Sequence, residues 1–230
     1  MRLLFSTAIV CAAQIASAQP RQLDERTIQD RIAKQAGHFR EGTPKQLPLE
    51  EMRPNADGVV EYQPMRINDY MVRSEPLTPA QELEETAIHS DAIILGTTLR
   101  RYSAANARHT ALYSDWVVTV TRVYKNKSTV EAQVGAEITV ARIGGDLWIN
   151  GRHVVYREAW FPEFEPDHNY VFYLRADPGS SSFLANGGAT FDVTGEKPIP
   201  FAEPKNPTSM KLFSLSSIAE FLKDVANTAR

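Results

Sequence analysis

Hydrophobic side chains between residues 91 and 193 alternate or run together as β-strands require. A short, wholly apolar run at Ala92–Gly96 predicts a strand that is buried on both faces. The longest strand is predicted at Tyr113–Tyr124, and another follows at Glu137–Ile143. On the long strand the alternation assigns to one face Trp116, Val118, Val120 and Tyr124, and to the other Asp115, Val117, Thr119, Thr121 and Val123.

The strongest turn signal is Asn150-Gly151, which lies between the apolar runs Leu147–Ile149 and Arg152–Tyr156. Asn-Gly in this setting is typical of a β-hairpin with a type I′ turn. Three further strands are predicted downstream, at Asn169–Arg175, Phe183-Leu184 and Thr190–Val193.

Two helices are predicted from their N-terminal caps. Thr78 caps the first helix, with Pro79 at its first position and Gln81 completing a capping box, and Ser217 with Glu220 repeats the capping box in the second. We expect the first helix to end near His89, with an inner face that consists of Leu83, Ala87 and Ile88. The second is expected to carry on one face Ile218, Phe221, Leu222 and Val225. A narrow apolar stripe predicts one more helix, at Leu23–Ala36.

Proline divides the chain into segments. Seven of the 14 prolines lie between Pro20 and Pro79, and none lies between Pro79 and Pro162, where the sheet is therefore expected. The predicted segments are a signal peptide at 1–18, a helix and loosely ordered proline-rich arm at 19–77, a β-domain with its leading helix at 78–197, and a linker with the last helix at 198–230. Short strands separated by turns predict a mainly β fold: an OB-like antiparallel barrel, or a small sandwich, flanked by N- and C-terminal helices.

The first 18 residues have the pattern of a secretory signal peptide. Arg2 precedes the uncharged stretch Leu3–Ala13, and small residues at Ala16 and Ala18 predict cleavage between Ala18 and Gln19. The apolar stretch is shorter than the roughly 20 residues that a membrane-spanning helix needs, so no span is expected after cleavage. Cleavage would also remove Cys11, the only cysteine, and would leave a cysteine-free chain in the periplasm or outside a bacterial cell.

The overall composition is that of a globular protein. Hydrophobic residues make up 43% of the chain and charged residues 23%, which is enough to form a sizeable core. A formal net charge of −3 gives no electrostatic reason to expect a nucleic-acid partner. The chain has no glycine-rich phosphate loop and no G-x-S-x-G motif, and no cofactor is predicted.

One loop, residues 160–168, combines three large aromatic side chains with three carboxylates. It supplies the candidate binding residues, which are Trp160, Phe161, Glu163, Phe164, Glu165 and His168. In one interpretation the aromatic rings stack on a ligand; in the other they plug the end of a barrel while the acids face water. We expect Trp160 in the core, and Phe164 is the better candidate for exposure.

The histidines leave an enzymatic alternative open. A zinc site built from His153, His168 and Asp167, or a carboxylate-based hydrolase that also uses Glu163, would place its chemistry in the 153–168 region. Isolated histidines without a metal are the commoner arrangement, and no histidine here pairs with another at helical or alternate-strand spacing.

Part of the chain resembles a family of uncharacterised exported bacterial proteins. The resemblance is carried by the segments Ser90–Gly96, Tyr113–Asn126, Gly135, Ile143–Gly145 and Tyr170–Leu174. The same order of elements is distantly similar to netrin-like and metalloproteinase-inhibitor domains, which implies an OB-type five-stranded barrel. Those domains rely on cysteines that this chain lacks, so the resemblance implies the barrel and not an inhibitor role.

These observations predict an exported, non-catalytic binding or interaction module of the bacterial envelope or exterior, with an unknown protein or small ligand as its partner.

Overall fold

The structure is a computed structural model, and it describes residues 48–62, 78–106, 109–157, 161–177, 180–200 and 217–229. The predicted signal peptide, its cleavage site at Ala18 and Gln19, the helix at Leu23–Ala36 and Trp160 lie outside the described residues.

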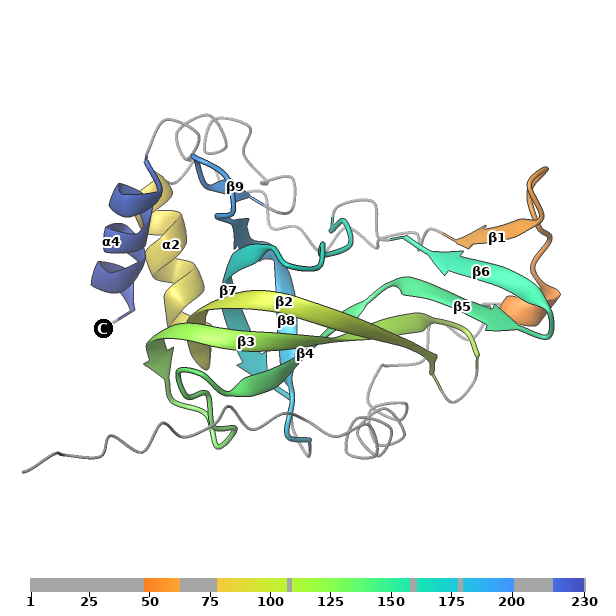
Figure 1. Ribbon diagram of the computed structural model, residues 1–230, viewed down its shortest axis with the longest axis horizontal. Helices are drawn as coiled ribbons and strands as arrows, with labels where there is room; N and C mark the ends of the chain where they lie inside the picture. The colour runs from red at the N-terminus through yellow and green to blue at the C-terminus, as the bar shows by residue number, and fades with distance from the viewer. Residues whose placement is uncertain are drawn as a thin grey trace, which may run out of the picture.

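Five strands form a closed β-barrel (Figure 1). They are β2 (Ala92–Ala105), β3 (Leu112–Asn126), β4 (Glu137–Ile143), β7 (Asn169–Ala176) and β8 (Phe183–Asp192). Their order is β4-β3-β2-β7-β8, and β8 returns to pair with β4. This closing pair is parallel, with Val140 opposite Phe183, whereas the other four pairs are antiparallel. The predicted OB-like barrel is confirmed, apart from that one parallel seam.

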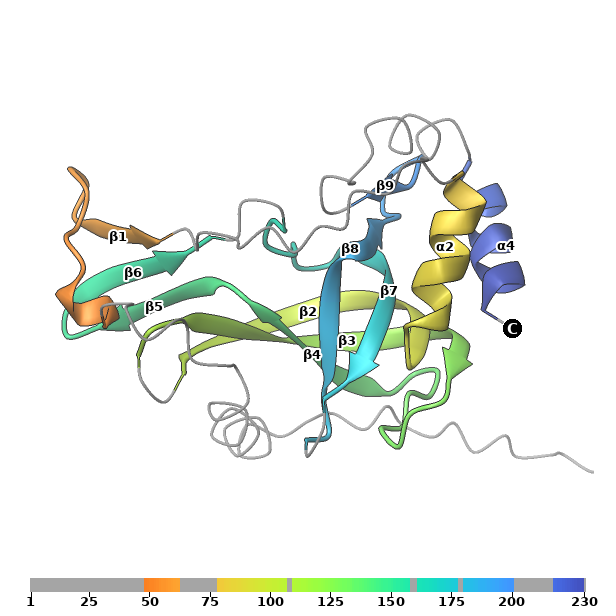
Figure 2. The ribbon, with the colours of Figure 1, turned by 180° about the vertical axis from the view of Figure 1, so that it is seen from behind.

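A smaller three-stranded sheet extends from the barrel (Figures 1 and 2). It contains β5 (Gly145–Ile149), β6 (Arg152–Tyr156) and β1 (Val59–Tyr62), in the order β1-β6-β5. Positive φ angles of 52° at Asn150 and 76° at Gly151 confirm the predicted type I′ hairpin between β5 and β6.

Strand β1 was not expected, because it lies in the proline-rich segment predicted to be irregular. It pairs in parallel with β6, and the short 3₁₀ helix η1 (Leu49–Glu51) precedes it. Val60 and Leu49 are both buried in a cluster with Leu112 and Ile149. This part of the arm therefore packs against the hairpin.

Two helices, α2 (Pro79–Ile88) and α4 (Ile218–Thr228), lie side by side against the barrel (Figures 1 and 2). Both predicted capping boxes are present. The helices cover apolar side chains of β2, β7 and β8. The buried cluster between the helices and the barrel includes Leu83, Ala87, Ile93, Val171, Tyr173, Phe191, Phe221 and Val225. The inward placement of Ile88 was wrong, because this side chain at the end of α2 is 68% exposed. Neither helix in the described part of the chain is both long and apolar enough to cross a membrane.

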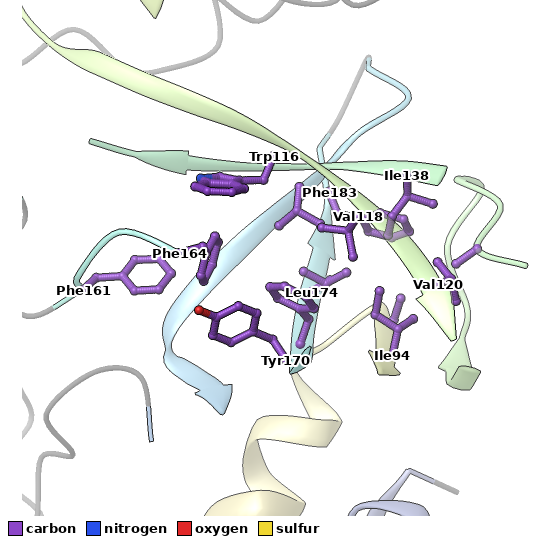
Figure 3. Close-up of a cluster of buried hydrophobic side chains, with 14 residues drawn as sticks. Ile94, Trp116, Val118, Val120, Ile138, Phe161, Phe164, Tyr170, Leu174 and Phe183 are labelled. Carbon is purple, nitrogen blue, oxygen red and sulfur yellow. The ribbon is translucent and has the colours of Figure 1, made fainter. Parts of the chain in front are cut away.

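The barrel interior holds the main hydrophobic core (Figure 3). Trp116, Val118 and Val120 point into it as predicted, but Tyr124 does not. The β2–β3 register shifts twice here, between Ile93 and Ile94 and between Leu95 and Gly96. These irregularities put Val123 against the interior and Tyr124 against the helix cluster. The two short strands predicted after residue 182 are one continuous strand, β8.

Candidate functional site

A cleft of about 640 Å³ separates the barrel from the hairpin. One wall is formed by Arg101–Ala105 at the end of β2, with His109 from the β2–β3 turn. The other wall is formed by Leu147–Asn150 of β5 and its turn. This volume lies within the range of about 300–1,000 Å³ typical of ligand pockets.

Trp148 stands on the hairpin wall of the cleft and is 69% exposed. It is paired across the hairpin with His153, and the two rings stack with centroids 5.3 Å apart and planes inclined by 22°. Among the exposed large hydrophobic side chains of the described residues, Trp148 is the one aromatic. The cross-strand stack and the tight turn hold the indole in place although it faces solvent.

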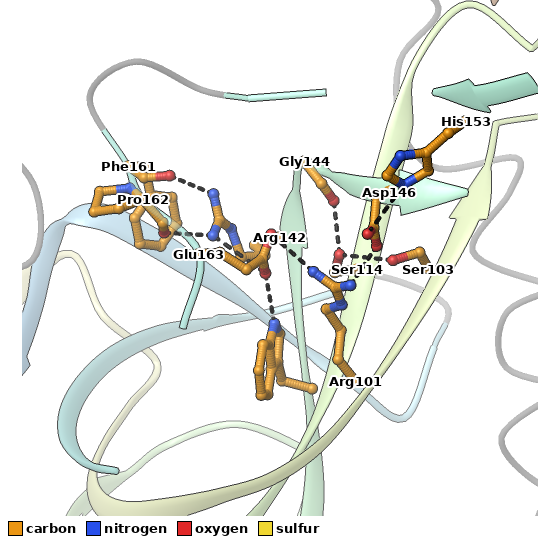
Figure 4. Close-up of polar contacts among 11 residues, drawn as sticks. Arg101, Ser103, Ser114, Arg142, Gly144, Asp146, His153, Phe161, Pro162 and Glu163 are labelled. Atoms are coloured by element: carbon orange, nitrogen blue, oxygen red, sulfur yellow. Dashed lines mark hydrogen bonds and ion pairs between the residues drawn. The ribbon is translucent and has the colours of Figure 1, made fainter. Parts of the chain in front are cut away.

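A chain of acidic and basic side chains joins the hairpin to the barrel (Figure 4). His153 Nε2 lies 3.3 Å from Asp146 Oδ2, and the other oxygen of Asp146 accepts a hydrogen bond from Arg101. Arg101 also lies 3.6 Å from Glu163, which in turn lies 3.4 Å from Arg142. Acids and bases thus alternate from β6 through β5 and β2 to the loop before β7 and to β4, and this alternation orients the hairpin on the barrel.

Arg142 is the most deeply buried member of this chain, with a side chain only 2% exposed. Its guanidinium donates to the carbonyls of Phe161 and Pro162 and lies 4.3 Å from the centre of the Phe161 ring. A buried cation needs such partners, because leaving a charge unpaired in the interior is costly. Glu163 supplies the countercharge, and it also accepts a hydrogen bond of 2.8 Å from Trp116 Nε1.

Two glycines let the chain turn from β4 into the hairpin. Gly144 and Gly145 have φ angles of 112° and 136°, which other residues rarely adopt. A Cβ on Gly145 would lie 2.8 Å from Ser103 Oγ and would also collide with Ser114 Oγ. Ser114 uses that hydroxyl to donate to the Gly144 carbonyl at 2.7 Å. Gly145 therefore permits the close approach of β5 to β2 and β3.

Two of the aromatic residues predicted as a binding loop, Phe161 and Phe164, are part of the core. Phe161 and Phe164 are 3% and 2% exposed, so the expectation that Phe164 would be exposed was wrong. Phe164 packs against the rings of Phe161, Trp116, Tyr170 and Phe172 at centroid distances of 5.1–5.8 Å (Figure 3). The burial of both rings fits the interpretation in which they plug the end of the barrel.

The polar residues of the same loop have different surroundings. Glu163 turns toward the two arginines, whereas the Glu165 side chain is 69% exposed and lies 3.2 Å from His168. The loop is fixed to β2 by Thr98, whose buried hydroxyl donates to the carbonyls of Glu165 and His168 at 2.5 and 3.1 Å.

His168 also lies 2.9 Å from Asp192, through Nδ1. The hydrogen bond to Asp192 raises the pKa of His168 above its ordinary value, with further support from the charges of Asp192, Glu165 and Asp167. His153, by contrast, contacts Asp146 and Trp148 at the cleft. The two histidines proposed for a zinc or hydrolase site therefore belong to different groups of contacts, and no three His, Cys, Asp or Glu side chains of the described residues are grouped to hold a metal.

One of the residues that sequence reasoning missed could have been found from its position on a strand. Arg142 alternates with Ile138 and Val140, two residues that face the barrel interior, so an arginine in that register indicated a buried charge. Trp148 was recognised only as part of a hairpin strand. Arg101 and Asp146 gave no local signal, because their pairing depends on the tertiary fold.

A scan against models of protein families and a search of the curated proteins found no match to this chain, so the family resemblance described above stays an expectation.

Proposed function

We propose that this chain is an exported, non-catalytic binding module of the bacterial envelope or exterior, and that it binds its partner in the cleft between β2 and β5. The observation that carries the proposal is Trp148, which is 69% exposed on the wall of a cavity of about 640 Å³. Exposing a large aromatic ring to water is unfavourable, and a bound partner would remove that cost. Tryptophan is also among the residues that contribute most to binding energy at protein interfaces.

The surroundings of Trp148 support a preformed site. The ring is held by its stack on His153, and the hairpin that carries it is connected to the barrel through the Arg101–Asp146 ion pair. A site that is already ordered loses little conformational entropy when a partner binds. The hydrolase alternative would draw on His153, His168, Glu163 or Asp167 in one pocket. His153 contacts Asp146, whereas His168 contacts Asp192 and Glu165.

The test is affinity capture from the native organism with matched variants. We expect a partner retained by the wild-type chain to be retained by Val134→Ala, which removes an exposed apolar side chain (66%) in the β3–β4 connection. Trp148→Ala should weaken binding of the same partner by at least tenfold, as measured by calorimetry with the purified pair, since truncation of an interface anchor costs about 2 kcal/mol or more. Equal affinity of wild type and Trp148→Ala would refute the assignment of the site.

A further inference from the structure

Within the part of the chain that the structure describes, each wall of the cleft is formed by a strand that has one edge without a further strand paired to it. Strand β5 is the last strand of its sheet, since within the described residues it pairs with β6 alone. Strand β2 pairs with β3 as far as Ala105, but its pairing with β7 ends at Thr97. The lining residues are consecutive on both strands, Arg101–Ala105 and Leu147–Asn150. A cavity over the face of a sheet would be lined by alternate residues, whereas one beside an edge contacts every residue.

The direction of the backbone groups on β2 follows from two hydrogen bonds near its end. Asn106 N–H donates to the Ala111 carbonyl at 2.9 Å, while the Leu112 carbonyl accepts from Gly144 N–H at 3.0 Å, on the far side of β3. In an antiparallel ladder the bonded direction alternates from one residue to the next. Ala104 and Tyr102 therefore bond to β3. Arg101, Ser103 and Ala105 direct their N–H and C=O groups away from β3, to the side on which β7 pairs with the earlier part of β2.

The same reasoning applies to β5. A two-residue type I′ turn is closed by the pair that flanks it, here Ile149 and Arg152, so Ile149 and Leu147 bond to β6. Trp148 lies between them and directs its N–H and C=O groups away from β6. On the edge of β5 away from β6, Trp148 thus presents both its exposed indole ring and its backbone N–H and C=O groups.

The stretches of both strands that line the cleft carry none of the prolines and lysines that often prevent strand addition. The lining residues include no proline and no lysine, and their one arginine, Arg101, is already paired with Asp146 and Glu163. Because this charge is satisfied, the walls offer mainly alternating backbone donors and acceptors together with Trp148, Leu147 and two alanines. An extended peptide backbone presents complementary donors and acceptors at the same repeat.

We propose, on the basis of the binding function proposed above, that an extended, mainly uncharged segment of a partner protein enters this cleft as an added β-strand. Its backbone bonds to the outward groups of Arg101, Ser103 and Ala105, and one of its apolar side chains packs on Trp148. The five residues of the β2 wall span about 13 Å at strand spacing, so a segment of four to five residues fills the edge.

The experiment measures amide hydrogen exchange by NMR in the chain from Gln19 onward. The probe is a synthetic peptide selected on this protein from a phage-displayed library of random 10-residue peptides. In the free protein the amides of Arg101, Ser103 and Ala105 should exchange faster than those of Tyr102 and Ala104, which bond to β3. The bound peptide should slow exchange at the first three by at least tenfold and leave the other two unchanged.

Three results would overturn the proposal, and they separate its failure from failure of the binding site. A peptide that shifts the Trp148 indole resonance without protecting Arg101, Ser103 and Ala105 would leave the cleft as a binding site and refute strand addition. Slow exchange at those three amides in the free protein would show that the rest of the chain already covers the edge. A library that yields no peptide for the cleft, while Trp148→Ala still abolishes capture of the native partner, would assign the cleft to a partner of another chemical class.

Discussion

Replacing Gly145 by alanine tests how the hairpin is joined to the barrel. Gly145 combines a φ of 136° with a site in which an added Cβ would lie 2.8 Å from Ser103 Oγ and would collide with Ser114 Oγ. Two separate penalties therefore apply to Gly145→Ala. The unfavourable backbone angle costs about 1–3 kcal/mol, and forcing an extra carbon into a packed site costs about 1–3 kcal/mol.

The sum predicts a loss of about 2–6 kcal/mol in the free energy of unfolding, a large fraction of the roughly 5–15 kcal/mol that holds a domain together. Other glycines in this chain separate the two penalties. Gly135 has a φ of 83° and open space around it, so Gly135→Ala carries only the backbone cost. Gly96 has no positive φ, but its Cβ would lie 2.5 Å from Val118 Cγ1, so Gly96→Ala carries only the steric cost.

Urea denaturation of the four variants, followed by circular dichroism and tryptophan fluorescence, gives the comparison. Gly195→Ala is the control, since Gly195 has neither a positive φ nor a neighbour within 4 Å, and its midpoint should stay near that of the wild type. Adding Ser114→Ala to Gly145→Ala should recover part of the steric loss, because it removes the colliding hydroxyl. A Gly145→Ala midpoint equal to that of Gly195→Ala would refute the close approach of β5 to the barrel.

Three further predictions concern the core, the loop before β7 and export. Phe164→Ala should lower the free energy of unfolding by about 3–5 kcal/mol, because the Phe164 side chain is only 2% exposed. Ile88→Ala, at a side chain that is 68% exposed, should change it by no more than about 0.5 kcal/mol. Similar urea midpoints for the two variants would place Phe164 outside the core. Because the pKa of His168 is raised in the folded protein, the Asp192 contact stabilises fully below the ordinary histidine pKa of about 6.5 and is lost as the pH rises through the raised value. Asp192→Asn should thus lower the urea midpoint more at pH 5.5 than at pH 9, and an equal loss at both would contradict this linkage. The exported protein should have the intact mass of a chain beginning at Gln19, and a mass that retains residues 1–18 in the periplasmic or medium fraction would refute signal cleavage.

Elements defined by local chemistry could be predicted from the sequence. The Asn150-Gly151 turn and the capping boxes at Thr78 and Ser217 each depend on residues within four positions of one another, and each is present. The boundaries of β4 were also predicted, since a turn at Gly135 precedes Glu137–Ile143 and Gly144-Gly145 ends it. Such short-range patterns require no knowledge of what lies across the sheet.

Elements defined by distant partners could not be predicted. Strand β1 has four residues, and its partner β6 lies about 90 residues later in the chain. The sequence of β1 itself does not indicate this pairing. Tyr124 lies on the opposite face of β3 from the one predicted, because the pairing of β3 with β2 has an irregular register. Such shifts arise when the two strands meet and leave no periodic trace in either sequence.

The cleft contains none of the binding residues predicted at 160–168, for a related reason. A cluster of aromatic and acidic residues at 160–168 looked like a binding loop, but Arg142, far earlier in the chain, pairs with Glu163 and stacks on Phe161 to hold this segment against the barrel. The cleft instead arises where β2 and β5 run beside each other. Only the tertiary structure brings these two strand edges together.

The central claim is that a partner binds between β2 and β5, and photo-cross-linking in living cells tests it most directly. A photoreactive phenylalanine analogue replaces Trp148 in the cleft, or Ile199 on β9 (Ile199–Pro200), which is 60% exposed and lies away from the hairpin (Figure 1). Irradiation should yield a discrete cross-linked product from position 148 and none from position 199. Products of equal yield at both positions, or none at position 148, would contradict partner binding between β2 and β5.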